Sequence, residues 1–278
     1  MANSIQLAKV YTNLLDEVYK QSALTAVLES DASLARQGAN ANEIIIPKLS
    51  MDGLADYSRN SGYVNGDVTL NWETVQFNYE RGRMFSVDNM DNEETQNIAF
   101  GRLAGEFIRT KVVPELDAFR FAKYAATEGA GVATGALASG ADVIAALRTA
   151  TSAMDEAEVP MEDRHLFITP TLLGLVEDMD TTKSKEVLSR FASITKVPQT
   201  RFYSAIELLD GKTPSEEKGG YKKADGGVEL NFEIIHKPAT LQFTKHAVPK
   251  VISQEQNQNA DAWKYGYRNY GLCDTYEN

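Results

Sequence analysis

The stretch that decides the fold runs from Tyr57 to Glu94 and reads YSRNSGYVNGDVTLNWETVQFNYERGRMFSVDNMDNEE. Its first part, up to about Asp67, is rich in Gly, Asn, Ser and Asp, with scattered aromatic residues. In the second part apolar and polar residues alternate, and alternation of this kind predicts β-strands. The apolar positions form two runs, which are Val68, Leu70 and Trp72, then Val75, Phe77 and Tyr79.

The two alternating runs are out of phase with each other, and the slip falls at Glu73–Thr74. A slip of one residue moves the apolar side chains to the other face of a strand, so it predicts a β-bulge or a strong twist there. A two-stranded arm of this length has too little apolar surface to be stable alone in water. We therefore expect something outside the subunit to complete the arm, which favours assembly over catalysis.

Four blocks of this sequence occur in the order seen in the major capsid proteins of tailed bacteriophages, which the chain resembles over essentially its whole length. The nearest resemblance is to a branch common among phages of Gram-positive hosts. The blocks are NSGYVNGDVTLNWETVQFNYERGRMFSVDNMDNEET (60–95), EFIRTKVVPELDAFRFAKYA (106–125), RHLFITPTLLGLV (164–176) and HKPATLQFTKHAVPKVISQEQNQNADAWKYGYRNYG (236–271).

The resemblance implies a mixed α+β fold, the phage capsid fold that is also called the Johnson fold. It divides the chain into four parts with different expected roles. These are an N-terminal arm (1–40), an extended β-loop (41–90), a peripheral domain with a long spine helix (91–160 and 240–270), and an axial domain (161–239 and 271–278).

The resemblance also implies a function. The protein would be a shell subunit that assembles with copies of itself into hexamers and pentamers around double-stranded DNA, with no catalytic, cofactor or metal site. Its further expected partners are a portal, a separate scaffolding protein and, as a candidate, a decoration protein. The first forty residues are too few for the long helical prodomain that some relatives carry. We therefore expect a separate scaffolding protein. The expected location is the virion, after assembly in the cytoplasm of the host bacterium.

Eight residues are candidates for contacts between subunits. Arg81 and Arg83 are the only basic residues between Gly62 and Gly101, so we expect them to form charge-assisted contacts between or within subunits. The resemblance places the extended loop on a neighbouring subunit and places a turn at His246–Pro249 near local three-fold axes. The full set is Tyr57, Arg59, Tyr63, Trp72, Arg81, Arg83, His246 and Pro249.

The composition is that of a soluble globular protein, with 43% apolar and 24% charged residues and a net charge of −11. The charge is uneven, because residues 41–96 carry four basic and ten acidic side chains. The sequence has no basic patch of the kind that predicts specific nucleic-acid binding. An acidic lining is nevertheless compatible with a container in which DNA must slide. No apolar run approaches the roughly 20 residues of a membrane span, and the lone Cys273 excludes an internal disulfide.

Motifs for catalysis are weak. Gly129, Gly131 and Gly135 follow a predicted helix and lack the spacing of a dinucleotide loop. The sequence DGKT (210–213) lacks the other glycine of a P-loop, and the acidic residues between Asp155 and Asp163 are typical of a solvated helix end. The three histidines have no spacing that predicts a metal site.

Two rival functions therefore remain. One is an encapsulin-like shell that encloses enzymes. The long N-terminal arm before the extended loop favours a phage capsid protein over such a shell. The other is an unrelated enzyme.

The remaining elements follow from periodicity and breakers. Pro114 interrupts the long helix that begins at Asp91 or Asn92 and ends near Gly129, and we favour a kinked continuation. Other expected helices cover 7–29 and begin at Asp142 and Pro170. Expected strands are 43–49, 165–169, 229–236, 239–244, 250–254 and a final one around Trp263, and 210–227 is expected to be a solvated loop.

Overall fold

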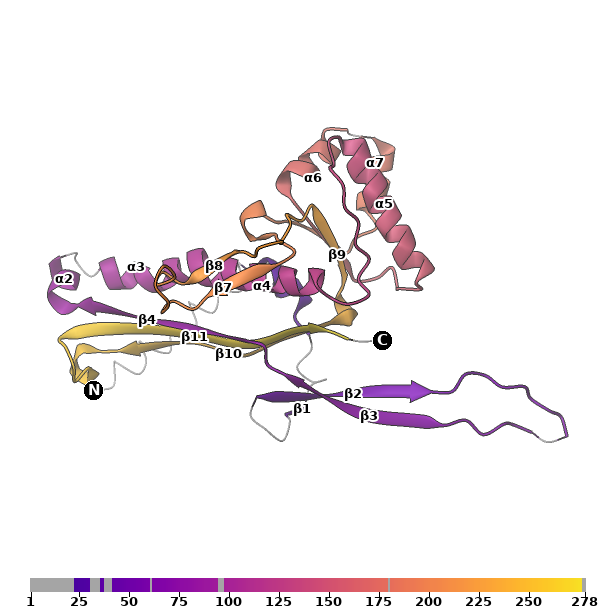
Figure 1. Ribbon diagram of the computed structural model, residues 1–278, viewed down its shortest axis with the longest axis horizontal. Helices are drawn as coiled ribbons and strands as arrows, with labels where there is room; N and C mark the ends of the chain where they lie inside the picture. The colour runs from indigo at the N-terminus through magenta and orange to yellow at the C-terminus, as the bar shows by residue number, and fades with distance from the viewer. Residues whose placement is uncertain are drawn as a thin grey trace.

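The structure is a computed structural model that describes residues 23–30, 36–37, 42–60, 62–94, 98–179 and 181–276. It has three visible parts: a long body of sheet and helix, a helical lobe above one end of the body, and a two-stranded ribbon that projects away from it (Figure 1). In the described part of the chain, no helix combines the length and the apolar content needed to cross a membrane.

The body is a three-stranded antiparallel sheet with the strand order β10 (Thr240–Ile252), β11 (Ala262–Thr275), β4 (Tyr79–Asp88). The predicted alternation around Trp263 is confirmed by β11, in which Tyr265 and Tyr267 are buried. Residues 271–275, expected in the axial domain, continue β11 and pair with 240–244 in this sheet. The domain boundaries remain a proposal.

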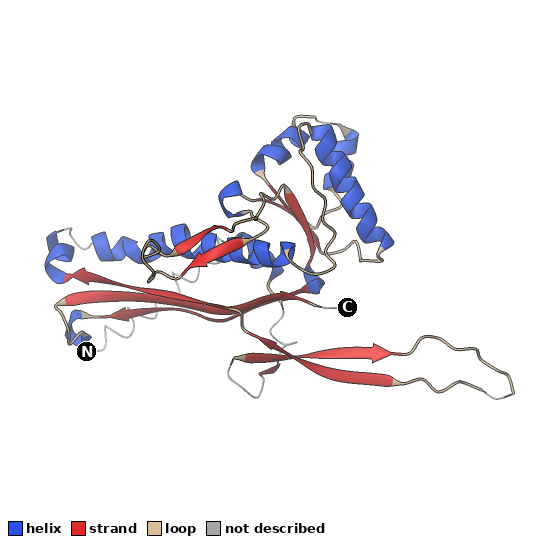
Figure 2. Cartoon of the chain, viewed as in Figure 1, coloured by secondary structure: helices blue, strands red, loops and turns tan. Residues whose placement is uncertain are grey.

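Helices run along one side of the body sheet (Figure 2). They are α2 (Asn89–Glu94), α3 (Ile98–Phe107) and α4 (Val113–Ala125), and a single π-helical segment, Ile108–Val112, joins the last two. Helix α2 begins at Asn89, two residues before the predicted start, and the Met90 N–H donates to Asp88 Oδ1 at its beginning.

Pro114 lies two residues after the end of the π-helical segment, within the first turn of α4. Proline has no N–H to donate to the preceding turn, and its ring clashes with a regular α-helical carbonyl. A wider π-turn at this point is a known way to accommodate such an interruption. The predicted continuation through Pro114 is confirmed, because Val112 and Val113 keep right-handed helical backbone angles.

The predicted turn at His246–Pro249 is wrong. Both residues lie inside β10, paired with Tyr270 and Tyr267 of β11, and the only irregularity is a register shift between Thr244 and His246. Strand β10 is an edge strand with a neighbour on one side only. Pro249 can therefore lack an N–H there, because an edge strand does not need every N–H for hydrogen bonds to a neighbouring strand. One edge strand therefore replaces the two predicted strands and their turn.

The lobe contains a second three-stranded sheet and three helices. Its strands are β6 (Ser193–Lys196), β5 (Arg164–Ile168) and β9 (Phe232–His236), in that order, and its helices are α5 (Gly140–Glu156), α6 (Pro170–Glu177) and α7 (Thr182–Leu188). Ser139 and Asp142 form a capping box at the start of α5. Strand β6 and helix α7 were not predicted.

A short hairpin of β7 (Ile206–Leu209) and β8 (Gly220–Lys223) lies beside the long helix. The predicted loop 210–227 therefore contains a strand. Of the predicted N-terminal helix 7–29, the part before residue 23 lies outside the described residues, and the rest is a 3-10 turn, Leu24–Leu28. Asp117, fully buried on α4, accepts hydrogen bonds from the N–H groups of Leu24 and Thr25, which fixes this turn to the body.

Candidate inter-subunit contact surface

The ribbon consists of β2 (Glu43–Met51) and β3 (Val68–Gln76), with the two-residue strand β1 (Arg36–Gln37) beside β2. The β2–β3 ladder runs without a register shift from Glu43↔Gln76 to Met51↔Val68. Of the two predicted alternatives at Glu73–Thr74, the β-bulge is therefore wrong, and the strong twist stays a prediction. The change of phase has a different cause, which is that the apolar side of the ribbon switches from one face to the other.

At its base the ribbon packs on the body through one face. Ile44 and Ile46 are buried, and Val75 and Phe77 pack beside them against Leu241, Phe243 and Leu272 of the body sheet. Directly opposite residues in an antiparallel pair share a face, so Ile44 and Val75 mark the same side of the ribbon. Farther out, this side carries polar residues, namely Lys48, Ser50, Thr69 and Asn71.

The other side of the ribbon carries what we call the outer apolar face, formed by Pro47, Leu49, Met51, Val68, Leu70 and Trp72. The register pairs these residues directly across the two strands, as Pro47↔Trp72, Leu49↔Leu70 and Met51↔Val68. Pro47 is exposed, and the exposed fraction of the other five runs from 46% for Trp72 to 69% for Val68. Because the base packs on the body through the opposite side, the body does not cover this face.

The tip of the ribbon, residues 52–60 and 62–67 of the described chain, is a long extended loop (Figure 2). The rings of Tyr57 and Tyr63 contact each other with centroids 4.8 Å apart, and Ser58 and Gly62 form a β-bridge. Asp52 Oδ2 accepts a hydrogen bond from the Asp67 N–H at 2.8 Å, which closes the loop at its neck. The predicted contact residues Tyr57, Arg59 and Tyr63 thus lie together at the end of a projection, fully on the surface.

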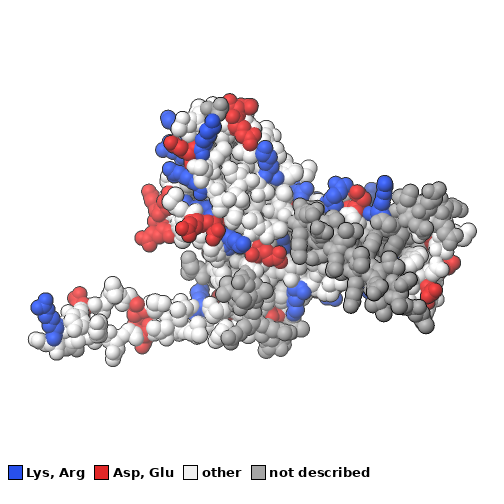
Figure 3. All heavy atoms as spheres, turned by 180° about the vertical axis from the view of Figure 1, so that it is seen from behind, with Lys and Arg blue, Asp and Glu red and all other residues white. Residues whose placement is uncertain are grey.

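Figure 3 shows the molecule from behind, with the ribbon extending from the body and bearing few charged side chains on the visible side. An exposed apolar area of this kind, with a polar surface around it, is typical of a protein–protein contact. The predicted residue Trp72 belongs to this area, whereas no sequence pattern indicated that Pro47, Leu49 and Met51 share its face.

Arg81 forms its contacts within the chain. Its Nε lies 2.7 Å from Glu115 Oε1 on α4, and its Nη2 donates to the carbonyl oxygens of Leu209 (2.7 Å) and Gly220 (3.2 Å). Tyr79 adds a hydrogen bond from its hydroxyl to the same Glu115 oxygen, and burial raises the pKa of Tyr79, which keeps the phenol neutral. Arg81 therefore joins the body sheet, the long helix and the hairpin.

Arg83 holds the loop of the same hairpin. Its guanidinium donates to the carbonyl oxygens of Lys218 (3.0 Å) and Glu217 (2.9 Å). Gly219 has a positive φ of 63°, and a Cβ there would lie 3.0 Å from Arg83 Nη1, so glycine suits the turn on both counts. Both arginines therefore have contacts within the subunit, which is one of the two predicted alternatives, and contacts with another subunit stay a prediction.

The weak catalytic candidates have structural roles. Asp155 forms an ion pair with the buried Arg164 at 2.7 Å, and His165 Nδ1 lies 2.7 Å from Ser193 Oγ on the neighbouring strand. Burial lowers the pKa of His165. Asp210 closes its own turn by accepting from the Thr213 hydroxyl and from the N–H groups of Thr213 and Lys212, which holds its pKa at about 2. Among the described residues, no group of three or more His, Cys, Asp or Glu is placed to hold a metal ion.

No family model and no curated protein matches the chain. Solved structures do match. The chain is similar to the structure titled "Capsid structure of the Cyanophage P-SCSP1u", with a TM-score of 0.52, 12% identity, and coverage of 86% of this chain and 82% of that one. It is similar to a structure from Gordonia phage Cozz, with a TM-score of 0.54, 11% identity, and coverage of 92% and 87%.

A third similar structure is titled "Crystal structure of virus-like particle from Pyrococcus furiosus". Its TM-score is 0.57 at 10% identity, and the match covers 97% of this chain and 95% of that one. The chain therefore has the capsid fold of tailed bacteriophages, the Johnson fold, over most of its length. The predicted α+β fold class is confirmed.

Proposed function

We propose that the protein is the major capsid protein of a tailed bacteriophage, and that its copies assemble into hexamers and pentamers of an icosahedral shell around double-stranded DNA. The observation that carries this proposal is the outer apolar face of the ribbon. It lies on a projection that the subunit's own body does not cover, in a chain with a capsid fold. A second copy of the chain completes it.

The charge of the chain supports DNA as the content. A net charge of −11 disfavours tight binding to phosphates and lets a packed genome slide against the shell. In this proposal the protein acts as a structural subunit without a catalytic, cofactor or metal site. It is located in the virion after assembly in the host cytoplasm, and its partners are a portal, a separate scaffolding protein and a decoration protein.

Electron microscopy of the purified full-length protein tests the proposal, with and without co-expressed phage scaffold. Shells are the expected result, and a small soluble oligomer under all conditions contradicts it. Deletion of Asp52–Gly66 removes the tip and should leave folded subunits that form no shells. Normal shells from the deletion variant would show that the ribbon tip is not needed for assembly.

An encapsulin-like compartment is the second candidate, favoured by the match to the virus-like particle from Pyrococcus furiosus. The two functions differ in what the particle encloses. Particles purified from cells that produce the complete phage should contain DNA, whereas an encapsulin-like shell should contain a protein cargo.

A further inference from the structure

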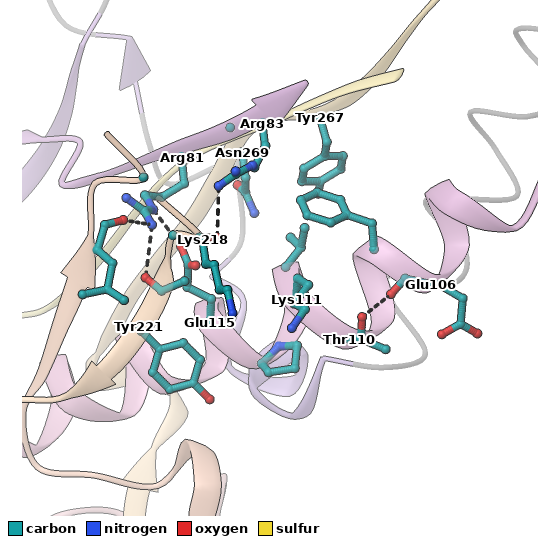
Figure 4. A pocket seen from close by; sticks show the side chains of 18 of the residues that line it. Arg81, Arg83, Glu106, Thr110, Lys111, Glu115, Lys218, Tyr221, Tyr267 and Asn269 are labelled. Carbon is teal, nitrogen blue, oxygen red and sulfur yellow. Dashed lines mark hydrogen bonds and ion pairs between the residues drawn. The ribbon is translucent and has the colours of Figure 1, made fainter. Parts of the chain in front are cut away.

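A groove of about 1210 Å³ lies between the body sheet, the long helix and the β7–β8 hairpin (Figure 4), and we call it the cationic groove. Arg83 of the sheet, Lys111 of the helix and Lys218 of the hairpin loop line it. Its volume exceeds the roughly 300–1,000 Å³ of pockets for small ligands. The groove is therefore large enough to receive side chains from a protein surface.

The groove is positively charged in an acidic protein. Six basic and three acidic residues line it. The acidic side chains are already engaged within the chain, in the pairs Glu115–Arg81 and Glu106–Arg109 and in the turn closed by Asp210. Four of the cations form no ion pair within the described part of the chain, and these are Arg83, Arg102, Lys111 and Lys218.

These four side chains are exposed, so a partner can reach them. Lys111 and Lys218 extend into the groove from opposite walls (Figure 4). The other end of the groove is apolar, where Phe85, Leu103 and Phe107 are half-buried. A matching partner therefore combines carboxylates with an apolar side chain.

The lobe carries a surface of this kind where α5 ends. The sequence DEAEVPMED (155–163), which we call the acidic corner, contains five acidic residues and no basic one. Asp155 pairs with Arg164. Met161 is 57% exposed. Three of the acidic residues are exposed and form no ion pair within the described residues, and these are Glu156, Glu158 and Glu162.

The backbone of the acidic corner is held in one conformation. Arg164, which is 2% exposed, donates from Nε to the Pro160 carbonyl oxygen at 2.9 Å, and its Nη1 lies 2.7 Å from Asp155 Oδ1. Glu158 and Asp163 have positive φ angles of 57° and 56°, which are uncommon outside glycine. A turn that is already fixed in this way loses little conformational freedom when it binds.

The acidic corner and the cationic groove lie on different sides of the same subunit. The β7–β8 hairpin is on one side of the lobe, and α5 runs along the other side and ends at a corner that faces away from the hairpin (Figure 1). Figure 3 shows acidic side chains gathered on the lower edge of the lobe, on the side of the ribbon. One copy therefore cannot fill its own groove.

We infer that the acidic corner of one copy docks in the cationic groove of the next copy. Its free carboxylates face the four unpaired cations, and Met161 meets the apolar end of the groove, since methionine adapts to irregular apolar surfaces. The two surfaces differ, so the contact is head-to-tail and repeats around a ring. The inference rests on the proposed function, since it names a pair of surfaces that joins subunits within hexamers and pentamers.

Charge reversal in the full-length chain tests the docking. Lys111→Glu with Lys218→Glu reverses the groove, and Glu158→Lys with Glu162→Lys reverses the corner. Each pair places like charges opposite each other, so each should lower the yield of shells about tenfold or more, counted by electron microscopy. The chain with all four substitutions again has opposite charges and should assemble within about twofold of the unaltered yield.

The matched control is Lys183→Glu with Arg190→Glu, which makes the same change of charge at exposed positions on and just after α7. It should assemble as the unaltered chain does. Normal shells from either reversed pair, or no recovery in the chain with all four substitutions, would overturn the docking while the proposed function stands. An equal loss of shells from the control would also overturn it, because the loss would then follow the net charge.

Disulfide trapping gives a second measurement that keeps every charge. Met161→Cys with Thr110→Cys places one exposed thiol on the corner and one on the groove, and the buried Cys273 gives little background. Mild oxidation of assembled particles should link neighbouring subunits, whereas Met161→Cys with Thr149→Cys, on the exposed side of α5, should not. Normal shells without links would overturn the docking alone. If the unaltered chain forms no particles, the docking and the proposed function fall together.

Discussion

Arg81 Nε lies 2.7 Å from Glu115 Oε1, and this ion pair joins strand β4 to helix α4 next to the β7–β8 hairpin. Both side chains are largely buried, with 24% and 12% exposed. Removal of one partner leaves a charge without compensation in a poorly solvated place. We expect Arg81→Leu to lower the free energy of unfolding by about 3 kcal/mol, measured by urea denaturation of the unassembled subunit.

Arg268 and Glu80 provide the control for this prediction. They form an ion pair between β11 and β4 in the same sheet, but both are more than half exposed. Exposed pairs of this kind contribute little, so Arg268→Leu should cost less than about 1 kcal/mol. Equal costs for the two variants would show that Arg81 does not stabilise the subunit through its buried partner.

The second prediction concerns the outer apolar face. Leu49 and Leu70 lie opposite each other on it and are both about half exposed. Replacement of both by serine should leave the free energy of unfolding of the subunit within about 0.5 kcal/mol per site, as is usual for surface positions. Shell yield, counted by electron microscopy, should drop strongly, because the contact loses its apolar area.

The matched control for the outer apolar face changes the other side of the ribbon at the same distance from the body. Asn71→Ser alters the polar side, opposite Lys48, and should assemble as the unaltered chain does. Normal shells from Leu49→Ser with Leu70→Ser would show that this face is not a contact.

The third prediction concerns Glu233 on β9. Both of its carboxylate oxygens are shielded from solvent and lack a hydrogen-bond partner in the described part of the chain, and this burial raises its pKa well above the ordinary value. The folded protein therefore keeps the proton at a pH where the unfolded chain has released it. Stability is highest below the ordinary carboxyl pKa and falls as the pH rises above it, by up to about 1.4 kcal/mol per pH unit.

Glu233→Gln removes this group, so the variant should gain stability over the unaltered chain as the pH rises from 5 to 7. The measurement is urea denaturation across this range. Glu229→Gln, at an exposed position on the same segment, is the control and should give no such gain. Parallel pH curves for Glu233→Gln and the unaltered chain would mean that the carboxyl group is solvated.

The fourth prediction is that shells hold together without covalent crosslinks. An isopeptide bond from the tip of the ribbon requires a lysine, and there is none from Leu49 to Thr110. Cys273 is buried, and burial raises its pKa to about 11, so it stays a neutral thiol that reacts slowly. Particles boiled in detergent with reductant should give a single band near 30.6 kDa, and a ladder of multimers would contradict this.

The sequence predicted those parts of the fold that depend on local pattern. Alternation at Val68, Leu70 and Trp72 identified a strand, and Pro170 correctly marked the start of α6. The same alternation does not indicate whether an apolar face is buried by the subunit's own body or by another subunit. An alternation with a period of two is the same whether a strand packs on its own subunit or on a neighbour. The switch of faces along the ribbon was therefore interpreted as a β-bulge or a strong twist.

Other errors arose where tertiary contacts outweigh local signals. The residues around Pro249 have the composition of a turn, yet the edge position of β10 permits proline in a strand. The β8 strand is short and rich in lysine and glycine, so only its pairing with β7 and its bonds to Arg81 reveal it. The pocket between the body sheet, the long helix and the β7–β8 hairpin brings together Arg83, Lys111 and Lys218 from distant segments (Figure 4), and no local window of sequence contains them together.

The switch of apolar sides along the ribbon also means that its inner and outer residues are under different evolutionary constraints. Ile44 and Ile46 are constrained by the folding of a single chain, whereas in the proposed shell Leu49 and Leu70 are constrained by what lies across from them in a neighbouring copy. Changes in the outer half can therefore accumulate without a cost in monomer stability, provided that the receiving surface changes with them. Substitutions within the nine residues of β2 can therefore change the contacts between proposed shell subunits without changing the stability of the single subunit, or the reverse.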